Sequence, residues 1–276
     1  MDLIDAHLHL IHRDQLTYNW MPNAPMLDTG DYTLADMKAL AAGRITGSIF
    51  MEVDVSDFRH EARMVKAMMQ PGSGLLGQIA GCNPAQAEGF DQWLADCDAL
   101  NVVGFRRILH EGPDDVSRSD TFRRNVRAIG ATGRVYDMVF LARQLPVALE
   151  LARACPEMTL VLDHCGVPDI AGGAMDPWRA DMAALAALPH VYCKLSGILA
   201  YCAPGTASLE VVRPWVEHVI EEFGPERVLW GSDWPVVNLG GGLPLWLDIT
   251  DGLLAGLSAD EQAAIRAGTA RRVYKL

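Results

Sequence analysis

The sequence predicts an α/β protein that folds as a single (β/α)8 barrel, the TIM barrel, and three observations favour this fold. Eight short β-rich apolar runs recur along the chain, and amphipathic stretches with helical spacing lie between most of them. Strands that alternate with helices pair in parallel through right-handed crossovers. The length of 276 residues is typical of one such barrel. No GxGxxG motif lies directly after the first run, where a dinucleotide-binding fold would have it, and no P-loop occurs, which disfavours nucleotide-binding folds.

The predicted strands and helices alternate along the whole chain. Strands are expected near residues 3–10, 47–53, 75–81, 102–108, 135–141, 159–165, 191–197 and 227–233. Apolar residues recur every three or four positions in the segments 34–43, 59–69, 87–100, 121–133, 146–155, 177–188 and 209–224. Gly133 and Gly224 are placed to end two helices, and Ser258 opens the last segment with a capping-box pattern. Because we find no repeat, low-complexity segment or linker, residues 1–276 are predicted to form one domain.

The composition argues against some classes of binding partner and indicates a cellular compartment. The formal net charge of −12 argues against nucleic acid and anionic membranes as partners, because both require clustered Lys and Arg. Hydrophobic residues make up 50% of the chain, which indicates a large core. The six cysteines include no CxxC pair, so a disulfide framework or a zinc ribbon is not expected. Since no signal peptide and no apolar run of about 20 residues occur, a soluble cytoplasmic protein is expected.

Two connections are longer than a barrel needs. Residues 11–32 form a loop with two tyrosines and one tryptophan, and residues 235–246 follow the last predicted strand. Long loops without regular structure in compact domains are usually functional. The first of them is expected to lie over the active site as a lid, at the carboxyl end of the barrel.

Polar side chains occur at the same end of five predicted strands. In a (β/α)8 barrel, residues at the carboxyl ends of the strands face the active site, and residues two apart on a strand share a face. One ionisable residue in a strand is often a paired core group, but five strands with such groups at one end indicate function. These residues are His7 and His9, Arg106 and Arg107, Asp163 and His164, Lys194 and Ser196, and Ser232 and Asp233.

Imidazole and carboxylate groups among them are suitable ligands for one divalent metal ion such as zinc: His7, His9, His164 and Asp233. Asp233 is predicted to be the base that takes a proton from the attacking water. Arg106 and Lys194 are candidates for stabilising negative charge or for holding polar groups of the substrate. For Glu52, after the second predicted strand, three roles remain open: metal ligand, substrate contact or partner of another ligand.

Several strand motifs resemble those of the amidohydrolase superfamily. They are DAHLHL, VVGFRRIL, LVLDHCGVP, VYCKLSGI and VLWGSDWPV, and they run in order through nearly the whole chain. The sequence is most similar to the amidohydrolase-2 branch of sugar lactonases and 2-pyrone-4,6-dicarboxylate lactonases. The resemblance implies a (β/α)8 barrel of the metal-dependent-hydrolase type that hydrolyses lactone rings.

The resemblance also implies roles for individual residues. The four candidate metal ligands would form the core of the active site, with His164 and Asp233 as catalytic residues. Strand residues and residues of the first long loop would face the substrate: Arg106, Lys194, Tyr18 and Trp20. Trp234, which follows Asp233, is a candidate wall of the pocket, and a packing role for it is equally open.

The chain departs from the superfamily pattern at two strands. Many members carry a histidine at the end of strand 5 and a carboxylated lysine or a glutamate at strand 4. Here these positions hold Tyr136-Asp137-Met138 and Arg106-Arg107. A bridged two-metal centre is therefore not expected. We expect one divalent ion, zinc or manganese, with metal-free catalysis as the alternative.

The sequence thus predicts a hydrolase that opens a small-molecule lactone, with an aldonolactone of a sugar-acid pathway as the first choice. A lactone dicarboxylate from aromatic degradation is the alternative, favoured if several arginines converge in the pocket. A decarboxylase is disfavoured by the missing histidine of strand 5. A non-catalytic barrel that binds a sugar acid would be expected to lack Asp233. The apolar helix around Trp215 is expected to face either the barrel or a second copy in a homo-oligomer.

Overall fold

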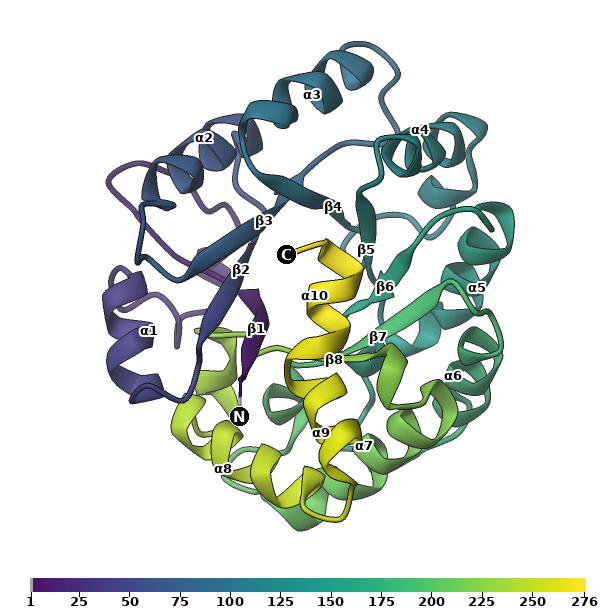
Figure 1. The fold of residues 1–276 in the computed structure, drawn as a ribbon. Coiled ribbons are helices and arrows are strands. Elements are labelled where there is room, and N and C mark those ends of the chain that lie inside the picture. The colour runs from purple at the N-terminus through teal and green to yellow at the C-terminus, as the bar shows by residue number, and fades with distance from the viewer. Residues whose placement is uncertain (1) are drawn as a thin grey trace.

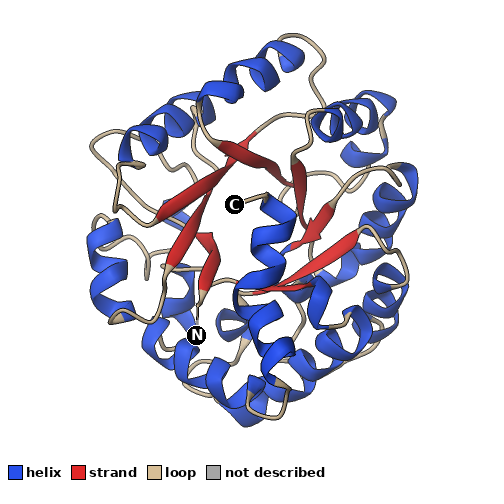
Figure 2. Cartoon of the chain, in the orientation of Figure 1, coloured by secondary structure: helices blue, strands red, loops and turns tan. Residues whose placement is uncertain are grey.

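Eight parallel strands form a ring that is surrounded by helices in the computed structural model, which describes residues 2–276 (Figure 1). The strands lie in chain order, each paired with its neighbours in sequence, which confirms the predicted (β/α)8 barrel (Figure 2). Their bounds are β1 Ile4–Leu8, β2 Gly47–Met51, β3 Leu75–Gly81, β4 Val102–Ile108, β5 Val135–Val139, β6 Leu160–Leu162, β7 Val191–Leu195 and β8 Val228–Trp230.

Each predicted amphipathic segment contains a helix. The helices are α1 Leu34–Ala41, α2 Phe58–Met68, α3 Phe90–Asp96, α4 Asp120–Ala131, α5 Leu145–Ala154, α6 Trp178–Ala186, α7 Leu209–Phe223, α8 Leu243–Leu254, α9 Ala259–Ala263 and α10 Thr269–Tyr274. Gly133 and Gly224 follow α4 and α7 with positive φ angles, as helix-ending glycines do. Before α9, the Ser258 hydroxyl accepts from the Glu261 N–H and the Glu261 carboxylate accepts from the Ser258 N–H, so the predicted capping box is present.

The outer helices bury their apolar faces. Trp215 on α7 is 4% exposed and packs against α6, so this part of the apolar helix faces the protein's own core. Within residues 2–276, no helix is both long and apolar enough to cross a membrane.

The barrel closes between β1 and the segment that follows β8. The Asp233 N–H donates to the His7 carbonyl oxygen, and the His9 N–H donates to the Trp234 carbonyl oxygen, both at 2.9 Å. These two hydrogen bonds continue the parallel ladder beyond the end of β8. The closure therefore places the backbone of two candidate histidines directly beside the candidate base.

A buried carboxylate anchors this closure from below. Asp5, on β1, accepts hydrogen bonds from Ser232 Oγ at 2.5 Å, from the Ser232 N–H at 2.8 Å and from the His7 N–H at 3.0 Å. Burial raises the pKa of Asp5, and the hydrogen bonds from Ser232 and His7 oppose that rise. A buried carboxyl group has lost its hydrogen bonds to water, and these three donors replace them.

The opposite end of the barrel is closed by the C-terminal helix. In Figure 1, α10 (yellow) lies across the barrel opening that faces the viewer. Its residues Ala270, Val273 and Tyr274 belong to the apolar cluster that fills the barrel interior with side chains such as Ile4 and Ile49. With this end filled, the site must open at the carboxyl ends of the strands, as in other barrels of this type.

Six of the eight strands end two or three residues earlier than the sequence predicts. β6 ends at Leu162 and β8 at Trp230, and the candidate residues beyond them lie in tight turns. His164 and Asp233 both have left-handed backbone conformations, with φ angles of 56° and 53°. Such conformations cost of order 1–3 kcal/mol for a residue with a side chain and are concentrated at functional sites. Strand periodicity alone does not report these turns.

The first long loop is tied at its base. An antiparallel bridge joins Ile11 to Tyr32, and a short 3-10 helix, Met21–Asn23, lies at the middle of the loop. Compact loops with adjoining ends are frequently functional. The loop lies on the carboxyl side of β1, where the sequence analysis expects a lid.

The closure of the barrel can be tested with Ser232→Ala. This change removes one hydrogen bond from a buried carboxylate, so we expect the free energy of unfolding to fall by about 1–3 kcal/mol. Urea denaturation followed by circular dichroism measures it. Ser56→Ala, at an exposed loop position, is the control. Equal stability of both variants would contradict the role of Asp5 and Ser232 in closing the barrel.

Candidate active site

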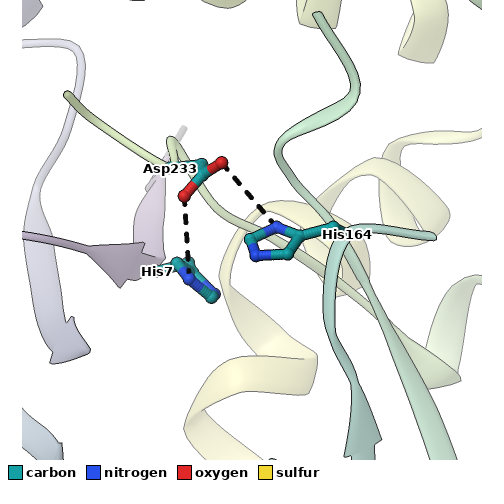
Figure 3. A group of neighbouring side chains, drawn as sticks. All are labelled: His7, His164 and Asp233. Carbon is teal, nitrogen blue, oxygen red and sulfur yellow. Dashed lines mark ion pairs between the residues drawn. The ribbon is translucent and has the colours of Figure 1, made fainter. Parts of the chain in front are cut away.

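Three histidines surround the carboxylate of Asp233, and Figure 3 shows two of them, His7 and His164. Asp233 Oδ1 lies 3.3 Å from His9 Nε2 and 3.7 Å from His7 Nε2, and Oδ2 lies 3.8 Å from His164 Nδ1. The His7 and His9 rings are 4.9 Å apart, and all four side chains are buried. The structure thus brings together the four residues that the sequence analysis assigns to a metal site.

The hydrogen bonds of His9 fix the direction of its lone pair. His9 Nδ1 lies 3.0 Å from the carbonyl oxygen of Met51, which can only accept, so Nδ1 carries the hydrogen. In the neutral ring, Nε2 then presents a lone pair to the carboxylate of Asp233 at 3.3 Å. Burial lowers the pKa values of His7 and His164, so both rings are neutral near pH 7. Two facing acceptors in a buried site are a suitable place for a cation.

A glycine makes room for the pair of His164 and Asp233. Gly197 follows β7 with a φ angle of 68°, and a Cβ atom there would lie 2.7 Å from His164 Nδ1 and 3.0 Å from Asp233 Oδ2. Ser196, one of the predicted strand-end residues, has its Oγ 3.0 Å from His164 Nδ1 and holds that ring. Close packing therefore requires a glycine at position 197, and Ser196 contributes a hydrogen bond to His164.

Arg106 joins β4 to the end of β2 beside the histidines. Its Nε donates to Glu52 Oε1 and its Nη2 donates to the Glu52 carbonyl oxygen, both at 2.6 Å. Its Nη1 lies 3.3 Å from Asp163 Oδ2 and 3.3 Å from His7 Nε2. Burial would lower the pKa of Arg106, but Glu52 and Asp163 raise it above its ordinary value, so the guanidinium stays charged. Of the roles left open for Glu52, the structure shows a partner of Arg106.

Lys194 lies beneath the site and is fully buried. Its Nζ donates to Asp137 Oδ2, lies 3.2 Å from Asp163 Oδ1 and lies 3.3 Å from His7 Nδ1. Asp137 also accepts from the Tyr274 hydroxyl at 3.2 Å, which links the C-terminal helix to this layer. Burial raises the pKa of Asp137 to about 6, although Lys194 opposes the rise. Lys194 thus contacts protein carboxylates, and the substrate contact expected for it has no direct route in this arrangement.

Carboxylates outnumber basic side chains among the buried groups of the site. Glu52, Asp137 and Asp163 pair with Arg106 and Lys194, whereas Asp233 has no Lys or Arg partner among the described residues. Ring nitrogens of His7 and His164 and a carboxylate oxygen of Asp233 lie within 4.8 Å of one another, and this donor set suits zinc. The residues therefore fit a single metal ion.

A cavity of about 330 Å³ opens above the cluster, within the range of small-ligand sites. His9, Arg106, His164 and Asp233 contribute polar groups to its lining. Both long loops also line it, the first with Trp20, Ala24 and Leu27 and the second with Pro235, Val236 and Leu239. The first loop therefore has the position expected of a lid.

The three predicted aromatic residues differ in position. Trp20 lines the cavity and donates a hydrogen bond from Nε1 to a backbone carbonyl oxygen after β2. Tyr18 packs edge-on against Trp20, and its hydroxyl accepts from the His12 N–H at 2.8 Å, so it supports the lid from behind. Trp234 is 1% exposed and packs against Tyr32 at the base of the loop, which is the packing role.

Four polar residues that line the cavity were not assigned to the site from the sequence: Asp54, His110, Glu111 and Tyr201. Each lies a few residues beyond a strand, in a stretch without a recognisable motif or period. Their position depends on how the connecting loops turn, and the sequence carries no local signal for this.

Comparison with known proteins identifies the family. The family model described as "Amidohydrolase" matches residues 4–276. The chain belongs to the amidohydrolase family. This amidohydrolase is 28% identical over 285 residues to an L-fucono-1,5-lactonase of Burkholderia multivorans, covering 99% of this chain and 96% of that protein. It is 35% identical over 198 residues to a 2-pyrone-4,6-dicarboxylate hydrolase of Comamonas testosteroni, covering 68% of this chain and 62% of that protein.

A solved structure agrees with this assignment. A zinc-bound amidohydrolase of Burkholderia multivorans matches this chain with a TM-score of 0.91 and 28% identity, and the match covers both chains completely. The (β/α)8 architecture and the family are therefore common to both proteins.

The buried ion pairs of this amidohydrolase can be tested with Lys194→Met. Removing the ammonium group leaves Asp137 and Asp163 without their shared partner, so we expect a loss of about 3–5 kcal/mol in the free energy of unfolding. Chemical denaturation measures it, and Lys66→Met on the exposed face of α2 is the control. A stability equal to that of the control would show that Lys194 is not needed to compensate these carboxylates.

Proposed function

We propose that this amidohydrolase is a lactonase that hydrolyses an aldonolactone, which is the uncharged cyclic ester of a sugar acid. The observation that carries the proposal is the Asp233 carboxylate, which is buried, lines the cavity and has no Lys or Arg ion pair within residues 2–276. Such a carboxylate is free to take a proton. The similarity to an L-fucono-1,5-lactonase over nearly the full length of both chains supports a lactone as the substrate.

Asp233 acts as the general base in the proposed mechanism. It accepts a proton from water while the water oxygen attacks the carbonyl carbon of the lactone. The tetrahedral intermediate then collapses as the bond between this carbon and the ring oxygen breaks. Asp233 returns the proton to the ring oxygen, which becomes a hydroxyl group. The product is an open-chain hydroxy acid, whose new carboxyl group ionises in solvent.

Two residues stabilise the carbonyl oxygen as it gains negative charge. Arg106 keeps a permanent positive charge at the cavity and acts on the oxygen through this charge, because its N–H groups already bind Glu52, Asp163 and His7. His164 is neutral and lines the cavity, and Ser196 fixes its ring through Nδ1. Preorganised groups of this kind lower the barrier because they need not reorient as the charge develops.

The proposal includes one divalent ion, zinc or manganese, held by the cluster of His7, His9, His164 and Asp233. The grouped donor atoms of His7, His164 and Asp233 support it, with His9 Nε2 3.3 Å from Asp233, as does the zinc of the similar Burkholderia multivorans structure. When bound, the ion would polarise the carbonyl group of the lactone. A second ion is not included, because the neighbouring carboxylates of Glu52, Asp137 and Asp163 are already paired with Arg106 and Lys194.

The charge of the cavity favours a neutral lactone over a dicarboxylate. Among the described residues that line it, Arg106 is the only Lys or Arg, and it is already paired with Glu52. Arg107 is exposed and lies outside this lining. A pyrone dicarboxylate, as in the name of the Comamonas testosteroni relative, would need several basic groups that converge on its carboxylates. That substrate class is the alternative.

The base can be tested with Asp233→Asn. An amide cannot accept the proton of water, so we expect kcat on a panel of aldonolactones to fall by about 10²–10⁴-fold with the fold intact. Acid release measured with a pH indicator follows the reaction, and circular dichroism checks the fold. Asp248→Asn, at an exposed position, should retain full activity. Near-normal turnover by Asp233→Asn would refute the assignment of the base.

The metal proposal can be tested by elemental analysis before and after chelation. We expect about one equivalent of zinc or manganese per chain, lost from His9→Ala, because the site offers one set of N and O donors. Activity should fall on chelation and return with added zinc. Full activity in metal-free protein would instead leave hydrolysis to Asp233, Arg106 and His164 alone.

A further inference from the structure

One wall of the cavity carries polar side chains that the hydrolysis does not use. Asp54 follows β2, and His110 and Glu111 follow β4, and all three line the cavity. Arg106 ties these two strand ends together through Glu52, so the two loops start from a fixed base. Much of the remaining lining is aliphatic, with Ile108, Val139 and Leu141 among the lining residues.

Asp54 is held in an unusual conformation. Its φ angle of 47° lies in the left-handed region, and its N–H donates to Glu52 Oε2 at 2.8 Å. Its own carboxylate has no hydrogen-bond or ion-pair partner within residues 2–276. Burial and the nearby Glu52 raise the pKa of Asp54, since both disfavour a negative charge. A half-buried acceptor in a strained turn, with no protein partner among the described residues and on the cavity lining, is available to a bound ligand.

His110 offers the complementary groups. Its Nδ1 is buried and has no hydrogen-bond partner within the described chain, and its Nε2 lies 3.9 Å from Glu111 Oε1. Burial lowers the pKa of His110, although Glu111 opposes this, so the ring is neutral near pH 7. A neutral imidazole has one N–H donor and one acceptor. Together with Asp54 it can bind hydroxyl groups, which also donate and accept.

The same wall is unfavourable for a carboxylate. Asp54, Glu111 and Asp233 contribute negative charge to the lining, and the N–H groups of Arg106 already bind Glu52, Asp163 and His7. A ligand carboxylate placed on this wall would face like charges without a free basic group. Juxtaposed like charges discriminate strongly between otherwise similar ligands.

We propose that Asp54 and His110 form a specificity site that binds the hydroxyl groups of the lactone and excludes lactones that carry a carboxylate at that position. Its substrate class rests on the proposed lactonase function. Neither residue takes part in proton transfer to the ring oxygen. Asp54 accepts hydrogen bonds from substrate hydroxyls, and His110 completes the pair as a neutral donor and acceptor.

The test compares two ligands that differ in one group. The first is an aldonolactam, whose amide ring resists hydrolysis, and the second is its counterpart with the terminal CH2OH replaced by a carboxylate. Calorimetry should show the neutral lactam binding about tenfold or more tightly to the unchanged protein. Asp54→Asn should remove most of this difference by strengthening binding of the anionic lactam. Asparagine tolerates the left-handed conformation, so the loop should keep its shape.

Control variants show whether a change in ligand binding comes from this site or from a general effect on the structure. Asp260→Asn, on the exposed start of α9, should leave the binding ratio unchanged. His110→Leu should weaken binding of the neutral lactam by about tenfold, and His110→Gln, which keeps a donor and an acceptor, should restore part of it.

Either proposal can fail while the other survives. Equal binding of the two lactams, or a ratio that Asp54→Asn does not change, would overturn the specificity site, even if the protein hydrolyses aldonolactones. A ratio that depends on Asp54 would support the site, even if no lactone in the panel is hydrolysed. In that second case only the proposed lactonase function would be refuted.

Discussion

The site depends on how the buried carboxylate of Asp5 closes the barrel. Asp5 accepts three hydrogen bonds, from the hydroxyl and N–H of Ser232 and from the N–H of His7, and so joins the first strand to the segment after the last. The backbone ladder immediately above it pairs His7 with Asp233. Residues from the two ends of the chain thereby become neighbours. The interaction that completes the fold is thus the one that assembles the candidate histidines around the candidate base.

Buried charge is arranged in layers below the cavity. Lys194 is surrounded by Asp137 and Asp163 in the deepest layer, and Arg106 is paired above it with Glu52 and Asp163. Both basic side chains are therefore occupied by protein carboxylates. Asp233 differs from these carboxylates because three imidazoles and no Lys or Arg surround it within residues 2–276, and unlike Lys194 it lines the cavity. This difference supports proton transfer at Asp233, a cation beside it and a substrate without carboxylates.

The barrel and the centre of the site could be predicted from the sequence because local patterns encode them. Apolar runs give the strands, and chemistry-bearing residues such as His7 and Asp233 occur at the carboxyl end of successive strands. The contacts of Lys194 could not be predicted, since its partners Asp137 and Asp163 come from other strands, and Asp137 is in turn bound by Tyr274 of the C-terminal helix. Asp54 was missed because its position follows from a left-handed turn, and no periodic pattern reports such a turn. Trp234 could be placed beside Asp233 but not assigned to packing, because its neighbour comes from a distant loop.

The most direct test of the central claim, that Asp233 moves a proton and does not attack the substrate, is a single turnover in water labelled with heavy oxygen. With enzyme in excess over an aldonolactone, mass spectrometry locates the label in the product and in the peptide that contains Asp233. A general base predicts the label in the new carboxylate of the product and none in the protein. Unlabelled product, with the label in Asp233, would show that the carboxylate is a nucleophile and would contradict the account.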